Sequence, residues 1–273
     1  MGRPLMCDSV IIPGEKFMNT SVLLDYHQRL SSIDINNDRN FISIYEEFLR
    51  DFSKFNVNAF DRIEESDFLY YAEFFTNCQK RYLSIHERES VKILLETGKK
   101  GNCSLRDLLV FPFVKNSYDR VRDLSMKIDF TRCRRAVMVG CGALPTTLFW
   151  LYDHYPAIDY IGLDVDAECV ALASQAVSAL NATGIQILNQ DGAEYDFSGV
   201  DFIFVANQVT PKKAVLERIA VTSDIDAQVV VRNPINLGNL LAECIQNNLP
   251  PRFSVQHQGN VSQAFLSMNL FLN

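Results

Sequence analysis

The second half of the chain alternates short apolar runs with longer segments that have helical periodicity. The apolar runs fall at residues 136–139, 159–163, 185–188, 200–205 and 227–231, and small or polar residues follow each of them. Short, nearly continuous apolar runs predict buried strands. Because helical segments separate these strands, the pattern predicts an α/β fold with a parallel, doubly wound sheet.

Two further apolar stretches, residues 253–257 and 264–271, come at the end of the sequence. Both read as strands, and we expect Gly259 and Asn260 to lie in the connection between them. The pattern therefore predicts that an antiparallel hairpin completes the sheet.

The first half of the chain has a different pattern. Aromatic and aliphatic residues recur at helical spacing across residues 41–52 and again across residues 68–85. Such stripes predict amphipathic helices, and we expect them to form a core rather than to bind a ligand. We expect residues 1–18 to be disordered, residues 19–130 to form an all-helical N-terminal domain or cap, and residues 131–273 to form the domain that contains the sheet.

The turn after the first predicted strand is the best candidate for a ligand site. Gly140, Cys141 and Gly142 follow the apolar run, and Leu144 and Pro145 precede a helical segment. This order of strand, glycine turn and helix is typical of nucleotide-cofactor sites, since glycine lets the backbone approach a ligand closely. The dinucleotide-binding motif has a third glycine where this chain has Pro145. We therefore expect the turn to bind something other than a pyrophosphate.

Acidic residues follow the next two predicted strands. Asp164 and Val165 follow the second strand, and an acid at this distance after the glycine turn typically binds ribose hydroxyls. Asp191 and Gly192 follow the third strand, where the acid would lie near an adenine amino group. This arrangement is that of S-adenosylmethionine (SAM) sites. Together with the final hairpin, it predicts a Rossmann-like class I methyltransferase fold that binds SAM.

Three other residues of this region have two possible roles each. Asn207, after the fourth strand, either hydrogen-bonds the amino-acid part of the cofactor or is a turn residue. Arg232, after the fifth strand, either binds a carboxylate through two parallel hydrogen bonds or forms a salt bridge between elements. Cys141 is expected to be a small residue tolerated in a tight turn rather than a nucleophile.

Composition narrows the functional classes. The net charge of -7 argues against nucleic acid as the main partner, and no apolar run approaches the ~20 residues of a membrane span. The seven cysteines include no CxxC pair, and the four histidines show no metal-ligand spacing. We therefore expect neither a disulfide framework nor a metal site. We expect a cytoplasmic protein that acts on small molecules. The sequence is compatible with a homodimer.

Between about residues 108 and 234 the chain resembles one family. Residues 139–145, VGCGALP, resemble the VGSGPLP motif of nicotianamine synthases, and residues 111–116, FPFVKN, resemble their FPYYxN segment. Similar features occur in bacterial opine-metallophore synthases and in azetidine-2-carboxylate synthases. Shorter likenesses to the YDID, TDI and LRS motifs of nicotianamine synthases lie at residues 163–166, 190–191 and 231–232.

The resemblance implies a reaction on the 3-amino-3-carboxypropyl arm of SAM rather than on its methyl group. The sulfonium is already a good leaving group, so such a reaction needs neither a metal nor a nucleophilic side chain. It needs the amine, the carbon and the sulfur in line, and the amine neutral. Helices before the first strand, the last expected at residues 117–128, would cover the site and exclude water. Phe111, Phe113 and Tyr118 are the aromatic candidates for that cover.

The chain departs from the family where an acceptor amine would bind. The family has a tyrosine after the FPYYxN asparagine, whereas this chain has Ser117, and Tyr118 comes one place later. An ungapped count places the glutamate that the family uses for the amine at Val91, with Glu87 and Glu89 nearby but out of register.

These departures favour an enzyme without a separate acceptor. The amine of SAM would attack its own γ-carbon and give azetidine-2-carboxylate and methylthioadenosine. The alternatives are a nicotianamine or opine-metallophore synthase that uses an amino-acid acceptor, a methyltransferase, and a SAM-binding regulator without activity. Tyr118 and Asn207 are the candidate catalytic residues. Tyr118 would either contact the sulfonium through a cation–π interaction or pack between the helices and the sheet.

Overall fold

The computed structural model describes residues 20–54, 65–98, 104–125, 128–234, 236–245, 248–260 and 265–272. Residues 1–18, which we expect to be disordered, lie outside the described residues.

In the described part of the chain, one sheet of seven strands has the order β3-β2-β1-β4-β5-β7-β6. The five strands β1 to β5 are parallel, and β7 lies antiparallel between β5 and β6. The doubly wound sheet predicted from the apolar runs is confirmed, and the last two strands form the expected antiparallel pair. The strands are β1 (Arg135–Val139), β2 (Asp159–Asp164), β3 (Ile185–Asn189), β4 (Phe202–Val205), β5 (Gln228–Pro234), β6 (Phe253–Asn260) and β7 (Phe265–Leu272).

Two strand boundaries differ from the prediction. Gly259 and Asn260 pair with β7 inside β6 instead of forming the connection between the two strands. β5 continues to Pro234, so Arg232 lies within the strand rather than after it. β5 is longer because β7 supplies antiparallel partners from Val229 to Pro234, beyond Val231, where the parallel pairing with β4 stops.

The two faces of the sheet are covered by different helices. On one face, Val137, Val139 and Ile203 pack in the cluster that contains Leu216 and Ile219 of α8. On the other face, the intervening strand residues pack with α5, α6 and α7. This alternation follows from the period of two along a strand, and it gives the sheet a core on both sides. The covering helices are α5 (Pro112–Ser125), α6 (Thr146–His154), α7 (Ala167–Ala179) and α8 (Lys212–Thr222).

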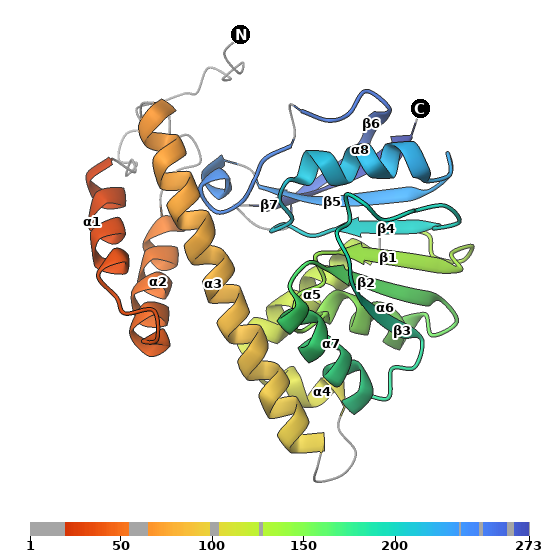
Figure 1. The fold of residues 1–273 in the computed structure, drawn as a ribbon, viewed down its shortest axis with the longest axis horizontal. Coiled ribbons are helices and arrows are strands. Elements are labelled where there is room, and N and C mark those ends of the chain that lie inside the picture. Colours follow the sequence, from red (N-terminus) through yellow and green to blue (C-terminus); the bar gives the residue numbers. More distant parts are fainter. Residues whose placement is uncertain are drawn as a thin grey trace.

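A helix of 34 residues, α3 (Glu65–Gly98), connects the N-terminal helices with the sheet. Its first half packs on α1 (Thr20–Ser31) and α2 (Asp38–Phe52), and Figure 1 shows both on the side of α3 that faces away from the sheet. In its second half, Val91 and Leu94 enter the same core cluster as Met138 of β1. The expected helical cap therefore shares a core with the sheet through α3, the short helix α4 (Leu105–Leu108) and α5.

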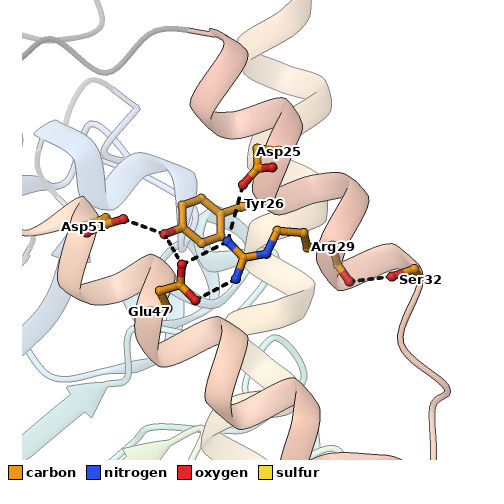
Figure 2. Close-up of polar contacts among 6 residues, drawn as sticks. All are labelled: Asp25, Tyr26, Arg29, Ser32, Glu47 and Asp51. Atoms are coloured by element: carbon orange, nitrogen blue, oxygen red, sulfur yellow. Dashed lines mark hydrogen bonds and ion pairs between the residues drawn. The ribbon is translucent and has the colours of Figure 1, made fainter.

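Polar contacts and aromatic packing join α1 and α2. Arg29 donates two hydrogen bonds to Glu47, at 3.0 and 2.6 Å, and the Tyr26 hydroxyl donates to Asp51 at 2.6 Å (Figure 2). These groups lie near solvent, where ion pairs add little to stability. The fully buried Phe48 stacks on Phe75 with ring centroids 4.5 Å apart. Aromatic packing is therefore the main force that holds the helical layer together.

We predict that Phe48→Ala lowers the free energy of unfolding by about 3–5 kcal/mol, because it leaves a cavity against Phe75. Urea denaturation followed by circular dichroism measures this change. The matched control is Leu24→Ala on α1, where the side chain is 44% exposed and the expected cost is below ~1 kcal/mol. Equal effects of the two substitutions would contradict the importance of this aromatic core.

Candidate functional site at the carboxyl edge of the sheet

The glycine turn between β1 and α6 has the conformation that its sequence predicts. Gly140 and Gly142 have φ values of +75° and +68°, which side-chain-bearing residues rarely adopt. A Cβ on Gly140 would also lie 2.6 Å from the side chain of Val209, after β4. Pro145 is the residue that caps α6, just before its first turn, and Leu144 is buried. The turn is therefore fixed in shape.

Two carboxylates from distant parts of the chain accept hydrogen bonds from this turn. Asp164, at the end of β2, accepts from the N–H of Gly142 at 2.8 Å and from that of Asp166 at 3.0 Å. Glu87, on α3, accepts from the N–H of Ala143 at 2.8 Å and also from the N–H of Leu144. A residue of the helical half of the chain, Glu87, thus contacts the backbone of the glycine turn.

The surroundings of Glu87 favour its neutral form. Burial raises the pKa of the Glu87 carboxyl from 4.5 to about 7, the negative charge of Asp164 adds to this rise, and the two backbone N–H groups oppose it. The same environment raises the pKa of the Cys141 thiol well above its ordinary value, again mainly through burial. Cys141 is therefore a neutral thiol, which fits the role of a small turn residue and not that of a nucleophile.

The ends of β2 and β3 carry the residues expected to contact an adenosine group. Val165 follows Asp164 and is 69% exposed, which is unusual for a valine and leaves an apolar surface beside the carboxylate. Asp191 uses one carboxylate oxygen to accept from the N–H of Ala193 at 2.8 Å. Gly192 packs against β1, since a Cβ there would lie 2.5 Å from Val139. Asp164, Val165 and Asp191 therefore lie at one edge of the sheet. Because Gly192 has no side chain, the segment after β3 can pack closely against β1.

Several buried polar atoms after β4 and within or after β5 find no hydrogen-bond partner among the described residues. Leaving such an atom unpaired costs roughly 1–3 kcal/mol, so a group of them points to a bound ligand. The amide nitrogen of Gln208 does donate, to the carbonyl of Leu241 at 3.0 Å, which leaves only its oxygen unpaired. The unpaired atoms are Asn207 Oδ1, Gln208 Oε1, Arg232 Nε and Asn239 Oδ1.

The aromatic residues expected to cover the site lie in two places. Phe113, in the first turn of α5, stacks on His86, with ring centroids 5.2 Å apart, and His86 precedes Glu87 on α3. Phe111 is partly buried against the core of the sheet. Tyr118 lies near Trp150 and His154 of α6, with ring centroids 6.1 and 6.4 Å apart. These contacts favour the packing role for Tyr118.

The sequence analysis named Glu87 and Glu89 as nearby but out of register, and residue counting could not select Glu87. An ungapped count pointed to Val91, which is fully buried in the core beneath the site. Val91 lies four residues, or about one helical turn, after Glu87, so both project from the same side of α3. The helical period would have been the better guide, because it places Glu87 on the same face of α3 as the counted position.

In the described ranges of the chain, no group of histidine, cysteine and carboxylate side chains has the geometry of a metal site. No described helix combines the length and the apolar character needed to span a membrane.

The raised pKa of Glu87 predicts a pH dependence of stability. The unfolded chain ionises Glu87 near pH 4.5 and the folded chain only near pH 7, so this residue destabilises the fold increasingly as pH rises through that window. Glu87→Gln removes the titrating group and keeps an oxygen that can accept from Ala143. We expect it to match the wild type near pH 4.5 and to be more stable by roughly 1–3 kcal/mol at about pH 8.

Urea unfolding at the two pH values measures this difference. The control is Glu89→Gln, since Glu89 is exposed two positions further along α3. The same stability difference between Glu87→Gln and wild type at both pH values would show that Glu87 does not titrate as its surroundings indicate.

No protein-family model matches this chain, and no curated protein matches it in sequence. Solved structures do match its fold. A glutamate-to-glutamine mutant of the nicotianamine synthase MtNAS, in complex with SAM, is 17% identical with a TM-score of 0.74, covering 94% of this chain and 99% of that chain. MtNAS in complex with MTA and tNA is 17% identical with a TM-score of 0.77, covering 93% and 97%.

An enzyme of another kind matches less of the chain. The mitomycin 7-O-methyltransferase MmcR is 15% identical with a TM-score of 0.50, covering 81% of this chain and 76% of that chain. The methyltransferase fold is thus common to all three structures. The chain has the fold of MtNAS over nearly its whole length, N-terminal helices included.

Proposed function

We propose that this protein is an enzyme that consumes SAM and transfers or cyclises its 3-amino-3-carboxypropyl arm. The observation that carries the proposal is the pair of carboxylates, Glu87 and Asp164, on the N–H groups of one glycine turn. It is supported by the fold shared with MtNAS, which has been crystallised with SAM and with MTA and tNA.

Asp164 and Val165 supply what the adenosine end of SAM needs. The Asp164 carboxylate would accept hydrogen bonds from the ribose hydroxyls, the usual role of an acid at the end of β2 in this fold. The exposed Val165 would cover one face of the adenine ring, and Asp191 would lie near the adenine amino group. The glycine turn between them lets the ligand approach the backbone closely.

In the proposed reaction an amine nitrogen attacks the γ-carbon of the arm from the side opposite the sulfur. The new C–N bond forms while the C–S bond breaks, and the sulfur takes the bonding electron pair and leaves as the neutral thioether methylthioadenosine. The ammonium product then loses one proton. Glu87 can accept that proton, because its pKa of about 7 is well placed for a general base at neutral pH.

Two versions of this reaction differ in the origin of the amine. In a cyclase, the α-amine of SAM attacks its own γ-carbon and gives azetidine-2-carboxylate. Ser117 at the family's tyrosine position and the packing of Tyr118 on α6 favour this version, which we put first. In a synthase of the nicotianamine or opine-metallophore type, an amino acid supplies the amine. The presence of Glu87 at the turn favours that version.

We predict that Asp164→Ala weakens SAM binding by roughly 1–3 kcal/mol, because the ribose loses a charged hydrogen-bond acceptor. Asp164→Asn keeps an acceptor for the N–H of Gly142 and separates the loss of the ligand contact from damage to the turn. Isothermal titration calorimetry measures both. Asp196→Ala is the control, since Asp196 is exposed and accepts a hydrogen bond from the N–H of Ser198 within its own turn. Unchanged affinity in both Asp164 variants would reject the ribose assignment.

We predict that the pure protein converts SAM alone into methylthioadenosine and azetidine-2-carboxylate in equal amounts, and that added amino acids do not accelerate the reaction. Mass spectrometry of the products measures this. Methylthioadenosine that forms only when histidine or another amino acid is added would establish the synthase version. S-adenosylhomocysteine as the product would indicate methyl transfer, and SAM binding without turnover would indicate a regulator.

A further inference from the structure

We propose that Arg120 and Arg232 together bind the carboxylate at the amino-acid end of the substrate, so that Arg120 is a second substrate-binding arginine. This inference rests on the proposed function and extends it to the other end of SAM. It starts from two largely buried arginines whose charges act on each other and that form no ion pair with an acid among the described residues.

The backbone brings the two arginines to the same side of the sheet. Arg232 lies two residues after Val230 on β5, so the two side chains are on the same face of the sheet. Val230 lies in the core that α5 covers. Its Nη2 lies 3.5 Å from the carbonyl oxygen of Arg120 on α5, to which it donates. Its Cζ is 5.7 Å from the centre of the Phe204 ring, on β4. Arg232 therefore occupies the space between the carboxyl edge of the sheet and α5.

Arg120 is held at this place by its own helix. Its Nε donates to the carbonyl of Asn116 at 3.0 Å, and its Nη2 lies 3.3 Å from the hydroxyl of Ser117. Ser117 stands at the position where the resemblance expects a tyrosine. A tyrosine ring there would take the space beside the Arg120 guanidinium. The small serine therefore leaves room for the arginine and accepts a hydrogen bond from it.

Neither guanidinium has a carboxylate partner among the described residues. Burial lowers the pKa of both side chains, and the nearby charge of Arg120 lowers the pKa of Arg232 further, to about 10, so both remain cations at neutral pH. By contrast, Arg29, Arg81 and Arg88 all lie on acids at the surface. Two like charges in a poorly solvated place repel each other, and an anion between them would relieve that repulsion.

The unpaired atoms around this pair fit the rest of an amino acid. A guanidinium carries five donors, and the Nε of Arg232 is fully buried with no acceptor, so a carboxylate would find donors in a suitable geometry. β4 and β5 pair in register up to Val205 and Val231, so Asn207 follows its strand close to Arg232. Its unpaired oxygen is an acceptor for an amine. Cations for the carboxylate and acceptors for the amine thus occur together at this end of the site.

Calorimetry with three probes tests the proposal: SAM, decarboxylated SAM, which keeps the sulfonium and the amine, and methylthioadenosine, which lacks the whole arm. We expect Arg120→Met and Arg232→Met each to weaken SAM binding roughly tenfold or more. Both should leave the affinity for the other two probes unchanged within about twofold, since neither probe has a carboxylate. Arg120→Lys, which keeps the charge but loses the planar fork, should give an intermediate loss for SAM alone.

The control is Arg122→Met, on the same helix, where Arg122 is exposed and paired with Asp119. Thermal unfolding of every variant checks the fold, and Arg120→Lys serves if a methionine variant does not fold. Unchanged SAM affinity in the Arg120 variants, or an equal loss for all three probes, would overturn the carboxylate assignment. If the wild type binds neither SAM nor methylthioadenosine, the proposed function itself is wrong, and this inference is rejected with it.

Discussion

The hydrogen bond from the Ala143 N–H to Glu87 is the contact on which the site depends, because it joins the two halves of the chain. It brings α3 to the glycine turn and puts an acid where a cofactor would bind. The cost is a carboxyl group in poor solvent, which is why its pKa rises to about 7. Stability is lost so that a titratable group stands in the site, a pattern typical of functional positions.

Charges are divided between the two sides of the carboxyl edge. The acids Glu87 and Asp164 accept hydrogen bonds from the glycine turn, and the cations Arg120 of α5 and Arg232 of β5 lie where that helix meets the sheet. A ligand with hydroxyl groups and a sulfonium at one part and a carboxylate at another would complement this division. Each group alone is weak evidence for such a ligand, but an acidic pair and a basic pair around unpaired amide oxygens are difficult to explain by packing alone.

Sequence reasoning was most successful where local rules apply. Apolar runs gave the strands, and the parallel sheet follows from helices between them. The glycines at 140 and 142 were identified because a glycine turn after a strand lets the backbone approach a ligand, and both have the positive φ values of such a turn. It was less successful for residues that act at a distance. Arg232 was identified from its strand, but the sequence gave no reason to select Arg120, since no local pattern distinguishes it from the exposed Arg122 on the same helix.

The sequence by itself determined the doubly wound sheet, the helical N-terminal half and the chemistry available at each strand end, because these depend on periodicity and on neighbours along the chain. Only the tertiary structure decided which long-range residues meet the turn. Glu87 reaches it and Tyr118 packs on α6, whereas the sequence left Glu87 out of register and both roles of Tyr118 open. The physical reason is that the rotation of a helix about its axis is set by its buried face, and α3 and α5 acquire that face only by packing on the sheet.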